Sequence, residues 1–276
     1  MVFLDYDVSS SFQALVRHSV EISSDHFQWE DILEEKYSTS EETASYSYTT
    51  DIALYDLCPR KYFFLRKISF PSIEKEKMLF GNLLHRCLEK MHKYEKYKNG
   101  IEILLTKEKE NLEKRSKFSF QKEELEKAKA ILEEYREKSE MLYENILQAE
   151  RKEFLEWRGS MLYGEIDLLA FQGEQWKIID FKTGTENPMY IEQLVLYQEL
   201  LKKYQKGQDV LLSLYYLLEQ REEKIELSLE EREKILDKIQ STIQKIQKKD
   251  FSKREYQEEI CDVCEFYAFC YRKENL

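Results

Sequence analysis

Two apolar segments of the sequence end in ionisable residues that together could bind a metal ion and act on a phosphodiester. Residues 164–169 read Gly-Glu-Ile-Asp-Leu-Leu, and residues 177–182 read Lys-Ile-Ile-Asp-Phe-Lys. Because side chains alternate along a β-strand, Asp180 and Lys182 lie on one face of the second segment. If the two strands pair as a hairpin, Asp167 lies beside Asp180. The pattern therefore predicts two carboxylates and one ammonium in a shared pocket.

Such a pocket suits a hard divalent cation, Mg²⁺ or Mn²⁺, because oxygen ligands bind these ions. Phosphodiester hydrolysis needs a metal that neutralises the phosphate and acidifies a water, and a cation near the attacking oxygen. On this hypothesis Asp167 and Asp180 bind the metal, and the carbonyl of Phe181 completes its coordination. Lys182 then orients the water or assists its deprotonation. The alternative is an Asp180–Lys182 ion pair on the surface of an edge strand.

Four of the five cysteines form a second chemical pattern. Cys261, Cys264 and Cys270 lie close together near the end of the chain, and Cys58 lies far upstream. Three neighbouring thiolates and one remote thiolate can bind a metal centre if the fold brings these segments together. Spacing alone does not separate an iron–sulfur centre from zinc, and buried thiols without metal are a third interpretation. Cys87 lies on a helical apolar stripe, so we expect it in the core.

Residue spacing predicts the elements that position these groups. A helical stripe within residues 78–98 consists of Phe80, Leu84, Cys87, Leu88 and Met91. Residues 100–147 are rich in Lys and Glu and predict two solvated helices. After residue 148 the pattern changes to that of strands, predicted at 151–157, 161–171 and 176–181 with turns at Gly159 and Gly173. The remaining predicted elements are a helix at 188–204, a strand at 210–218, an edge strand at 225–227 and a helix from 228 or 229 to about 248.

This order of elements favours an α/β or α+β fold, in which helices flank a mixed central sheet. We expect residues 1–48 to form an acidic arm or linker and residues 49–276 to form the main domain. Within that domain, about 100–147 is a helical insertion and 260–276 a cysteine-rich tail. The N-terminal boundary follows the charge, since residues 1–57 carry a net charge of −10 and residues 58–276 a net charge of −1.

Composition restricts the class of protein. The chain has 276 residues, of which 42% are hydrophobic and 35% charged, with only 7 Gly and 3 Pro. That content is sufficient for a core and favours helices over a loop-rich all-β architecture. No apolar run approaches a membrane span and five cysteines do not make a disulfide scaffold, so we expect a cytoplasmic protein without membrane partners. The balanced charge after residue 57 is compatible with a phosphate-bearing substrate.

Taken in order along the chain, these residues resemble the motifs of the PD-(D/E)XK nuclease superfamily, in its RecB-like branch. That branch carries a histidine on an early helix, an aspartate in a Gly-x-x-Asp strand, an Asp-x-Lys strand and a Gln-x-x-x-Tyr helix. The matching residues here are His85, Asp167, Asp180 with Lys182, and Gln193 with Tyr197. The resemblance implies a restriction-endonuclease-like mixed sheet flanked by helices.

The resemblance also implies a role for each residue. The histidine and the two aspartates bind metal and Lys182 is catalytic, whereas Gln193 and Tyr197 support the site and contact nucleic acid. Glu150 falls where the family often has an acidic residue, and it could be an outer ligand or a surface charge. Glu165 alternates onto the face of Asp167 and is a minor candidate. Read without the motif, His85 would be an ordinary core histidine.

The cysteines extend the resemblance to the iron–sulfur subgroup of this branch, which joins an early Cys-Pro-x-x-Tyr to a C-terminal Cys-x2-Cys-x5-Cys. In that subgroup four cysteines, here Cys58, Cys261, Cys264 and Cys270, hold a [4Fe–4S] cluster that pins the C-terminus to the first helices. Zinc is the less favoured alternative. Arg60 and Lys61 with Tyr62 and their neighbours interleave basic and aromatic residues, a pattern suited to single-stranded DNA. The alternative, for half of these aromatic residues, is packing around the cluster.

The function that the resemblance implies is metal-dependent DNA cleavage in repair, recombination or defence, with an exonuclease on single-stranded DNA or DNA ends favoured. The relatives include AddB-like proteins, CRISPR-associated exonucleases and nuclease domains of UvrD-like helicases. The sequence contains no Walker A loop, so a helicase motor would belong to another part of a longer protein or to a partner. The alternative is a catalytically inactive module that binds DNA ends as a scaffold.

Overall fold

A computed structural model describes residues 45–70, 76–94, 97, 100–116, 118–142, 145–172, 175–204 and 209–271. The chain divides into two compact units, 1–43 and 44–276, and the described residues all belong to the second. The predicted acidic arm therefore lies outside the described residues up to residue 44. Its last residues do not: Ser45–Ser47 form strand β1 of the central sheet, ahead of the domain start predicted at residue 49.

The strands of the described residues form one six-stranded mixed sheet in the order β1-β3-β4-β5-β6, with β2 paired to β3. Strands β2 and β3 are antiparallel, as are β3 and β4, whereas β4 and β5 run parallel. The predicted mixed α/β class with a central sheet is thus confirmed. The bounds are β1 (Ser45–Ser47), β2 (Asn145–Trp157), β3 (Ser160–Gln172), β4 (Gln175–Lys182), β5 (Leu211–Tyr216) and β6 (Arg221–Ile225).

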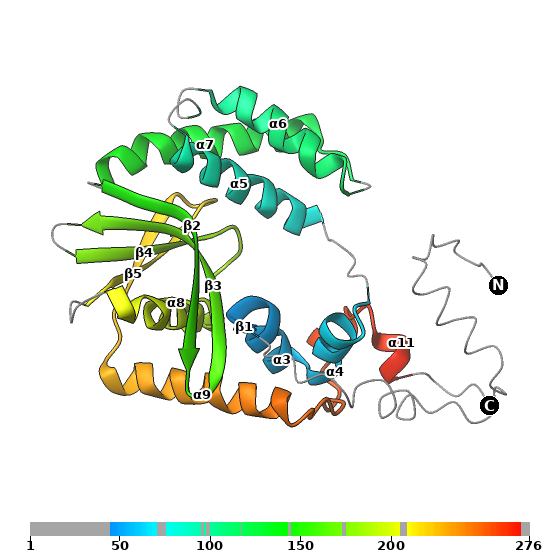
Figure 1. The fold of residues 1–276 in the computed structure, drawn as a ribbon. Helices are drawn as coiled ribbons and strands as arrows, with labels where there is room; N and C mark the ends of the chain where they lie inside the picture. The colour runs from blue at the N-terminus through cyan, green and yellow to red at the C-terminus, as the bar shows by residue number, and fades with distance from the viewer. Residues whose placement is uncertain are drawn as a thin grey trace, which may run out of the picture. The chain divides into compact units, whose positions relative to one another are not determined.

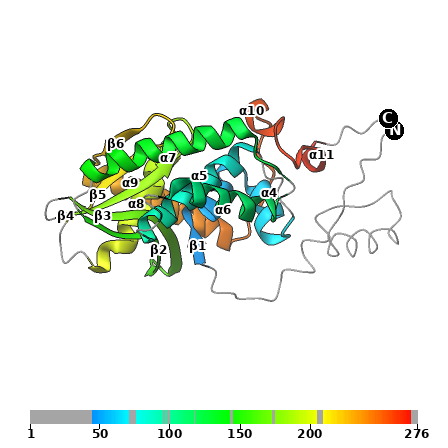
Figure 2. The same ribbon diagram turned by 90° about the horizontal axis from the view of Figure 1, so that it is seen from above.

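Helices cover both faces of this sheet (Figure 1, Figure 2). On one face, α5 (Glu76–Lys93), α6 (Ile101–Glu113) and α7 (Lys122–Leu142) enclose a core that includes Leu84, Leu132 and Phe181. On the other face, α8 (Pro188–Leu201) and α9 (Leu229–Gln247) enclose a second core with Ile166 and Leu200. Helix α8 continues into the short 3₁₀ helix η4 (Lys202–Tyr204). No helix in the described residues combines the length and apolarity that a membrane crossing requires.

Short helices surround Cys58 and the C-terminal cysteines. The π-helix η1 (Tyr48–Ala53) leads into α3 (Leu54–Leu57), then α4 (Pro59–Tyr62) and the π-helix η2 (Phe63–Lys67), while α10 (Glu258–Cys261) and α11 (Tyr267–Cys270) form the tail. Pro59 occupies the first turn of α4, so Cys58 lies at the junction of two helices as predicted.

Several predicted boundaries were wrong because they depended on tertiary contacts. Strand β2 begins at Asn145, inside the predicted helical insertion, since it follows β3 to the end of their shared ladder. The edge strand predicted at 225–227 lies instead at Arg221–Ile225. The two Lys/Glu-rich helices were predicted to carry apolar residues at helical spacing beside a solvated charged face, and Leu104 of α6 and Tyr135 of α7 are indeed fully buried. The predicted turn at Gly173 lies outside the described residues.

Candidate active site

The β3–β4 hairpin places the two predicted aspartates side by side. Leu168 pairs with Ile179, so the next register position sets Asp167 opposite Asp180. One Asp167 carboxylate oxygen accepts a hydrogen bond of 2.8 Å from the backbone N–H of Phe181. The same oxygen lies 3.4 Å from Nδ1 of His85, which α5 carries over the sheet. Residues 82 positions apart thus meet at one point.

Lys182 lies at the centre of a second set of contacts. Its ammonium forms an ion pair with Asp180 and donates a hydrogen bond of 2.8 Å to Oε1 of Gln193 on α8. The Gln193 amide in turn donates to the hydroxyl of Tyr197 at 2.7 Å. Asp180 is only 1% exposed and β4 lies between β3 and β5, so this is not a surface ion pair on an edge strand.

Glu150 joins the first cluster from strand β2. Ala149 pairs with Leu168 and Arg151 with Ile166, which sets Glu150 opposite Asp167. Ligand atoms of His85, Glu150 and Asp167 all lie within 4.8 Å of one another. Asp180 is not in this group, because its carboxylate faces Lys182. A residue that the sequence analysis gave as an outer ligand or a surface charge therefore lies beside the motif residues.

Burial and mutual repulsion shift the protonation of these acids. Burial, followed by the neighbouring Asp167 and Glu165, raises the pKa of Glu150 to about 8. Burial also raises the pKa of Asp180 to about 6, with Asp167 adding to the effect and Lys182 opposing it. Burial acts most strongly against the charge on Asp167 as well, but His85, Lys182 and the Phe181 amide together outweigh it and lower the pKa of Asp167. The carboxyl groups of Glu150, Asp167 and Asp180 therefore outnumber the cationic groups beside them, His85 and Lys182.

This donor set fits a divalent cation. The carboxylates of Glu150 and Asp167 converge with the imidazole of His85. The buried Asp180 carboxylate, paired with Lys182, lies opposite Asp167 on the neighbouring strand. Carboxylates suit Mg²⁺ and Mn²⁺, and an added imidazole nitrogen shifts the preference toward Mn²⁺. The Phe181 amide contacts Asp167, whereas metal binding by the Phe181 carbonyl stays a prediction.

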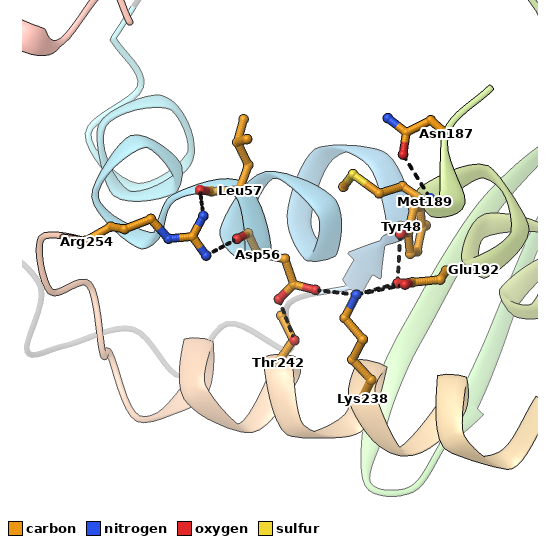
Figure 3. A network of polar contacts seen from close by, with 9 residues as sticks. All are labelled: Tyr48, Asp56, Leu57, Asn187, Met189, Glu192, Lys238, Thr242 and Arg254. Atoms are coloured by element: carbon orange, nitrogen blue, oxygen red, sulfur yellow. Dashed lines mark hydrogen bonds and ion pairs between the residues drawn. The ribbon is translucent and has the colours of Figure 1, made fainter. Parts of the chain in front are cut away.

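Polar contacts with α9 and with the segment around α3 fix the position of α8, and therefore the position of the residues that α8 directs toward Lys182. Glu192, next to Gln193, accepts hydrogen bonds from the Tyr48 hydroxyl at 3.0 Å and from Lys238 of α9 at 2.7 and 2.8 Å. Lys238 also lies 3.4 Å from Asp56 of α3, so that it bridges two carboxylates (Figure 3). This network, Tyr48–Glu192–Lys238–Asp56, ties the helix that orients the lysine to the rest of the core.

The glycine of the Gly-x-x-Asp segment allows α8 to approach β3 closely. A Cβ atom on Gly164 would lie 2.4 Å from a methyl carbon of Leu200 and 2.9 Å from the ring of Tyr197. Real side chains do not tolerate such contacts. The absence of a side chain at Gly164 therefore sets the depth at which the Gln193–Tyr197 face of α8 lies over the sheet.

Cys58 and the C-terminal cysteines lie in segments that pack together. Lys61 of α4 donates to Glu265 at 2.9 Å, and the rings of Phe64 and Phe266 are 4.8 Å apart. Burial, and more weakly the nearby Cys58 thiol, raises the pKa of Cys270. Among the described residues, no three cysteine sulfurs all lie within 4.8 Å of one another. Cys87 is buried in α5 as predicted, and its burial raises its thiol pKa to about 12.

The aromatic residues beside the cysteines are largely structural. Tyr62, Phe63 and Phe64 are each 2–3% exposed and pack with Phe251 and the tail, so they offer no face to a base. Of the two interpretations, packing holds for these three and stacking on DNA does not, because the rings lie buried between the two cysteine-bearing segments. Tyr267 and Phe269 are partly exposed.

Sequence reasoning missed two residues of α8, one beside Lys182 and one that anchors the helix. The Tyr190 ring lies 4.3 Å from the Lys182 ammonium, and Glu192 anchors α8 as described above. Tyr190 is detectable in principle, because it precedes Gln193 by three residues and so shares its helix face. Glu192 carried no comparable signal, since its partners are remote in sequence.

Comparisons with known proteins relate the chain to a nuclease superfamily. The family model for the PD-(D/E)XK nuclease superfamily matches residues 47–271. A solved structure from Eubacterium rectale, described as a "putative exonuclease", superposes with a TM-score of 0.57 at 13% identity, covering 86% of this chain and 91% of that chain. A second structure, SSO0001, gives a TM-score of 0.33 at 15% identity over 81% of this chain and 98% of that one. No curated protein matches. The family model spans most of the chain and its motif residues converge in the fold, and this chain belongs to the PD-(D/E)XK nuclease superfamily.

Proposed function

We propose that this chain is a metal-dependent deoxyribonuclease of the RecB-like branch that acts as an exonuclease on single-stranded DNA or DNA ends. The observation that carries the proposal is the convergence of His85, Glu150 and Asp167 beside the Asp180–Lys182 pair. The likeness of the fold to the E. rectale protein, which is described as a "putative exonuclease", supports cleavage from an end over internal cleavage.

Each residue of the site has a part in the proposed hydrolysis. His85, Asp167 and Glu150 would hold a divalent cation, with Asp180 at its edge. When bound there, that cation would neutralise the phosphate and acidify the attacking water. Lys182, held between Asp180 and Gln193, donates a hydrogen bond to the attacking water and stabilises the negative charge that develops on the phosphate. The water oxygen would form a bond to phosphorus and release one proton to the solvent, while the bond from phosphorus to the ester oxygen breaks and the leaving oxygen takes up a proton from the solvent.

The test is cleavage of oligonucleotides labelled at the 5′ or the 3′ end, under anaerobic conditions with Mg²⁺ or Mn²⁺. We expect Lys182→Ala and Asp180→Ala to lose roughly 100-fold or more in kcat, the range for a displaced acid–base group. Lys224→Ala, on the exposed face of β6, is the matched control and keeps wild-type activity. Equal activity in the wild type and both site variants refutes the assignment. A wild type that binds DNA but cuts nothing with either metal establishes the inactive scaffold instead.

We further infer that Cys58, Cys261, Cys264 and Cys270 hold a [4Fe–4S] cluster that joins α4 to the tail. The contacts Lys61–Glu265 and Phe64–Phe266 support it, since they bring the two cysteine-bearing segments together. One zinc ion, with Zn–S bonds of about 2.3 Å, requires sulfurs within about 4 Å of one another. Among the described residues no three cysteine sulfurs lie within 4.8 Å of one another, so the choice of iron–sulfur over zinc rests on the resemblance of the cysteine motifs.

Anaerobic purification followed by absorption spectroscopy and metal analysis tests the cluster. A brown protein with about four irons per chain, lost in Cys264→Ser, is the expected result. A colourless protein with one equivalent of zinc would establish the alternative. Cys87→Ser is the matched control and leaves the metal content unchanged, because Cys87 lies in the α5 core. Neither the described residues nor the comparisons point to a helicase motor.

A further inference from the structure

Strands β2 and β3 continue beyond the metal-binding cluster to a pair of aromatic rings at the surface. Phe154 and Tyr163 stand opposite each other in the antiparallel ladder, with ring centroids 4.8 Å apart. Phe154 is 52% exposed and Tyr163 is half-buried. The facing Tyr163 ring makes Phe154 one of a pair of aromatic rings at the surface, whereas an apolar residue exposed singly would need no explanation.

The two rings lie on the same face of the hairpin as the cluster. Residues 161, 163 and 165 of β3 are more exposed than 160, 162, 164 and 166, which are buried. The buried set includes Leu162 and Ile166, which pack in the core under α8. The exposed set therefore faces away from α8, toward the side of the sheet that carries α5. Glu165 contacts Glu150, which connects this face to the cluster.

Polar residues fill the space between the cluster and the rings. Lys152 pairs in register with Glu165 and lies 3.5 Å from its carboxylate, with 63% of the lysine side chain exposed. The Tyr163 hydroxyl donates to Glu165 at 3.3 Å. An exposed ion pair of this kind is weak, so Lys152 can turn to a phosphate at little cost.

We propose that Phe154 and Tyr163 form a stacking platform for the bases of a single strand whose backbone enters the metal-binding cluster. The proposal rests on the proposed function and adds the path by which the substrate reaches the site. Tyr163 lies four positions before Asp167 on β3, which corresponds to roughly 13 Å along an extended strand. If a single DNA strand is bound with its backbone at the cluster, a base a few nucleotides from the cleaved bond would therefore lie on the two rings.

Single-stranded nucleic acid fits this surface better than a protein partner. The apolar area consists of two rings with Met161 beyond them, and charged Lys152, Glu156 and Glu165 border it. A stable protein interface needs about 1,000 Å² or more of buried surface, which so small a patch does not supply. Stacking on an aromatic ring requires only a base face, because every base has one.

Binding is measured by fluorescence anisotropy of a labelled oligo-dT in EDTA, so that cleavage does not interfere. A series of oligonucleotides carries one abasic site at successive positions from the end. We expect Phe154→Ala to weaken binding of the intact strand by about tenfold, the scale of one stacked base. Wild type loses the same factor when the abasic site reaches the platform, whereas Phe154→Ala is insensitive to it. Phe154→Trp restores both the affinity and the abasic profile.

Ile103→Ala is the control, because Ile103 is an apolar residue on α6 that is more exposed than Phe154, at 71%, and lies on another element. It should match the wild type in affinity and in abasic profile. An unchanged affinity in Phe154→Ala, identical abasic profiles in wild type and variant, or no binding by the wild type would overturn the platform. The cleavage assay reports separately on the proposed function, since a protein that cuts DNA with no dependence on Phe154 loses only the platform.

Discussion

Glu150 stands opposite Asp167 in the β2–β3 ladder, and it does so with a backbone φ of 50°, in the left-handed region. Residues other than glycine adopt this conformation rarely. Its effect is a change of direction: Ala149 packs in the core beneath α5, whereas the guanidinium of Arg151 lies 4.7 Å from the Tyr204 ring on the opposite side. Local strain of this kind is commonly retained at functional sites. Here it accompanies a pair of adjacent carboxylates.

The Glu150 carboxyl should make the stability of the metal-free protein depend on pH. Its pKa is about 8 in the folded protein and about 4.3 in an unfolded chain, so the fold favours the protonated form. The stabilisation is therefore complete below about pH 4 and is lost as the pH rises toward 8. We expect the Tm in EDTA to fall over this range, and Glu150→Gln to flatten the fall. Identical pH profiles for wild type and variant would contradict this.

Metal should reverse that loss, because a cation binds the ionised form of Glu150. We expect Mn²⁺ to raise the Tm of the wild type more at about pH 8 than at about pH 6, since at the lower pH the proton competes with the metal. Glu150→Gln should reduce the Mn²⁺-dependent shift at the higher pH. A shift that is equal at both pH values, or unaltered in the variant, would remove Glu150 from the metal site.

Gln193→Leu should lower kcat while leaving the fold intact. The variant keeps the volume of the side chain but removes the oxygen that accepts the Lys182 hydrogen bond and the amide that donates to Tyr197. We expect a loss of roughly 10- to 100-fold in kcat, typical of groups that orient a functional residue, with a smaller change in KM. Gln244→Leu, exposed on α9, should have no effect. A Gln193 variant with normal kcat would show that Lys182 needs no positioning.

Lys238→Met should destabilise the protein by about 1 kcal/mol, because it leaves Asp56 and Glu192 without the cation between them. Urea unfolding measures the change. The control on the same helix is Lys234→Met, whose partner Glu230 is exposed, and which should change the free energy of unfolding very little. Equal effects of the two substitutions would show that the network in Figure 3 contributes no more than a surface pair.

Gly164→Ala should destabilise the protein by about 1–3 kcal/mol, the usual cost of an extra methyl group in a filled core. The added carbon would meet Leu200 at 2.4 Å and push α8 away from the sheet. Cleavage should fall as well, since α8 carries Gln193. The double variant Gly164→Ala/Leu200→Ala makes room for the methyl group and should recover part of the activity. A fully stable and active Gly164→Ala would show that α8 does not depend on this contact.

Local pattern in the sequence was sufficient for the pairs of residues that share one element. Asp180 and Lys182 point the same way because strands alternate with a period of two, and Gln193 meets Tyr197 because helix residues four apart are neighbours. The convergence of His85, Asp167, Asp180 and Lys182 followed from the family resemblance, since an ordered set of motifs carries tertiary information that composition and periodicity do not.

Tertiary structure alone decided the positions that depend on register and packing between elements. Glu150 reached the site through the alignment of β2 with β3 and one left-handed residue, and neither leaves a local pattern in the sequence. The aromatic residues beside the cysteines looked available to DNA but are buried, whereas Phe154, an ordinary strand residue by its spacing, is exposed. Periodicity fixes which way a side chain leaves its own backbone. What lies on that side is set by contacts between residues far apart in the chain, and these exist only once the chain has folded.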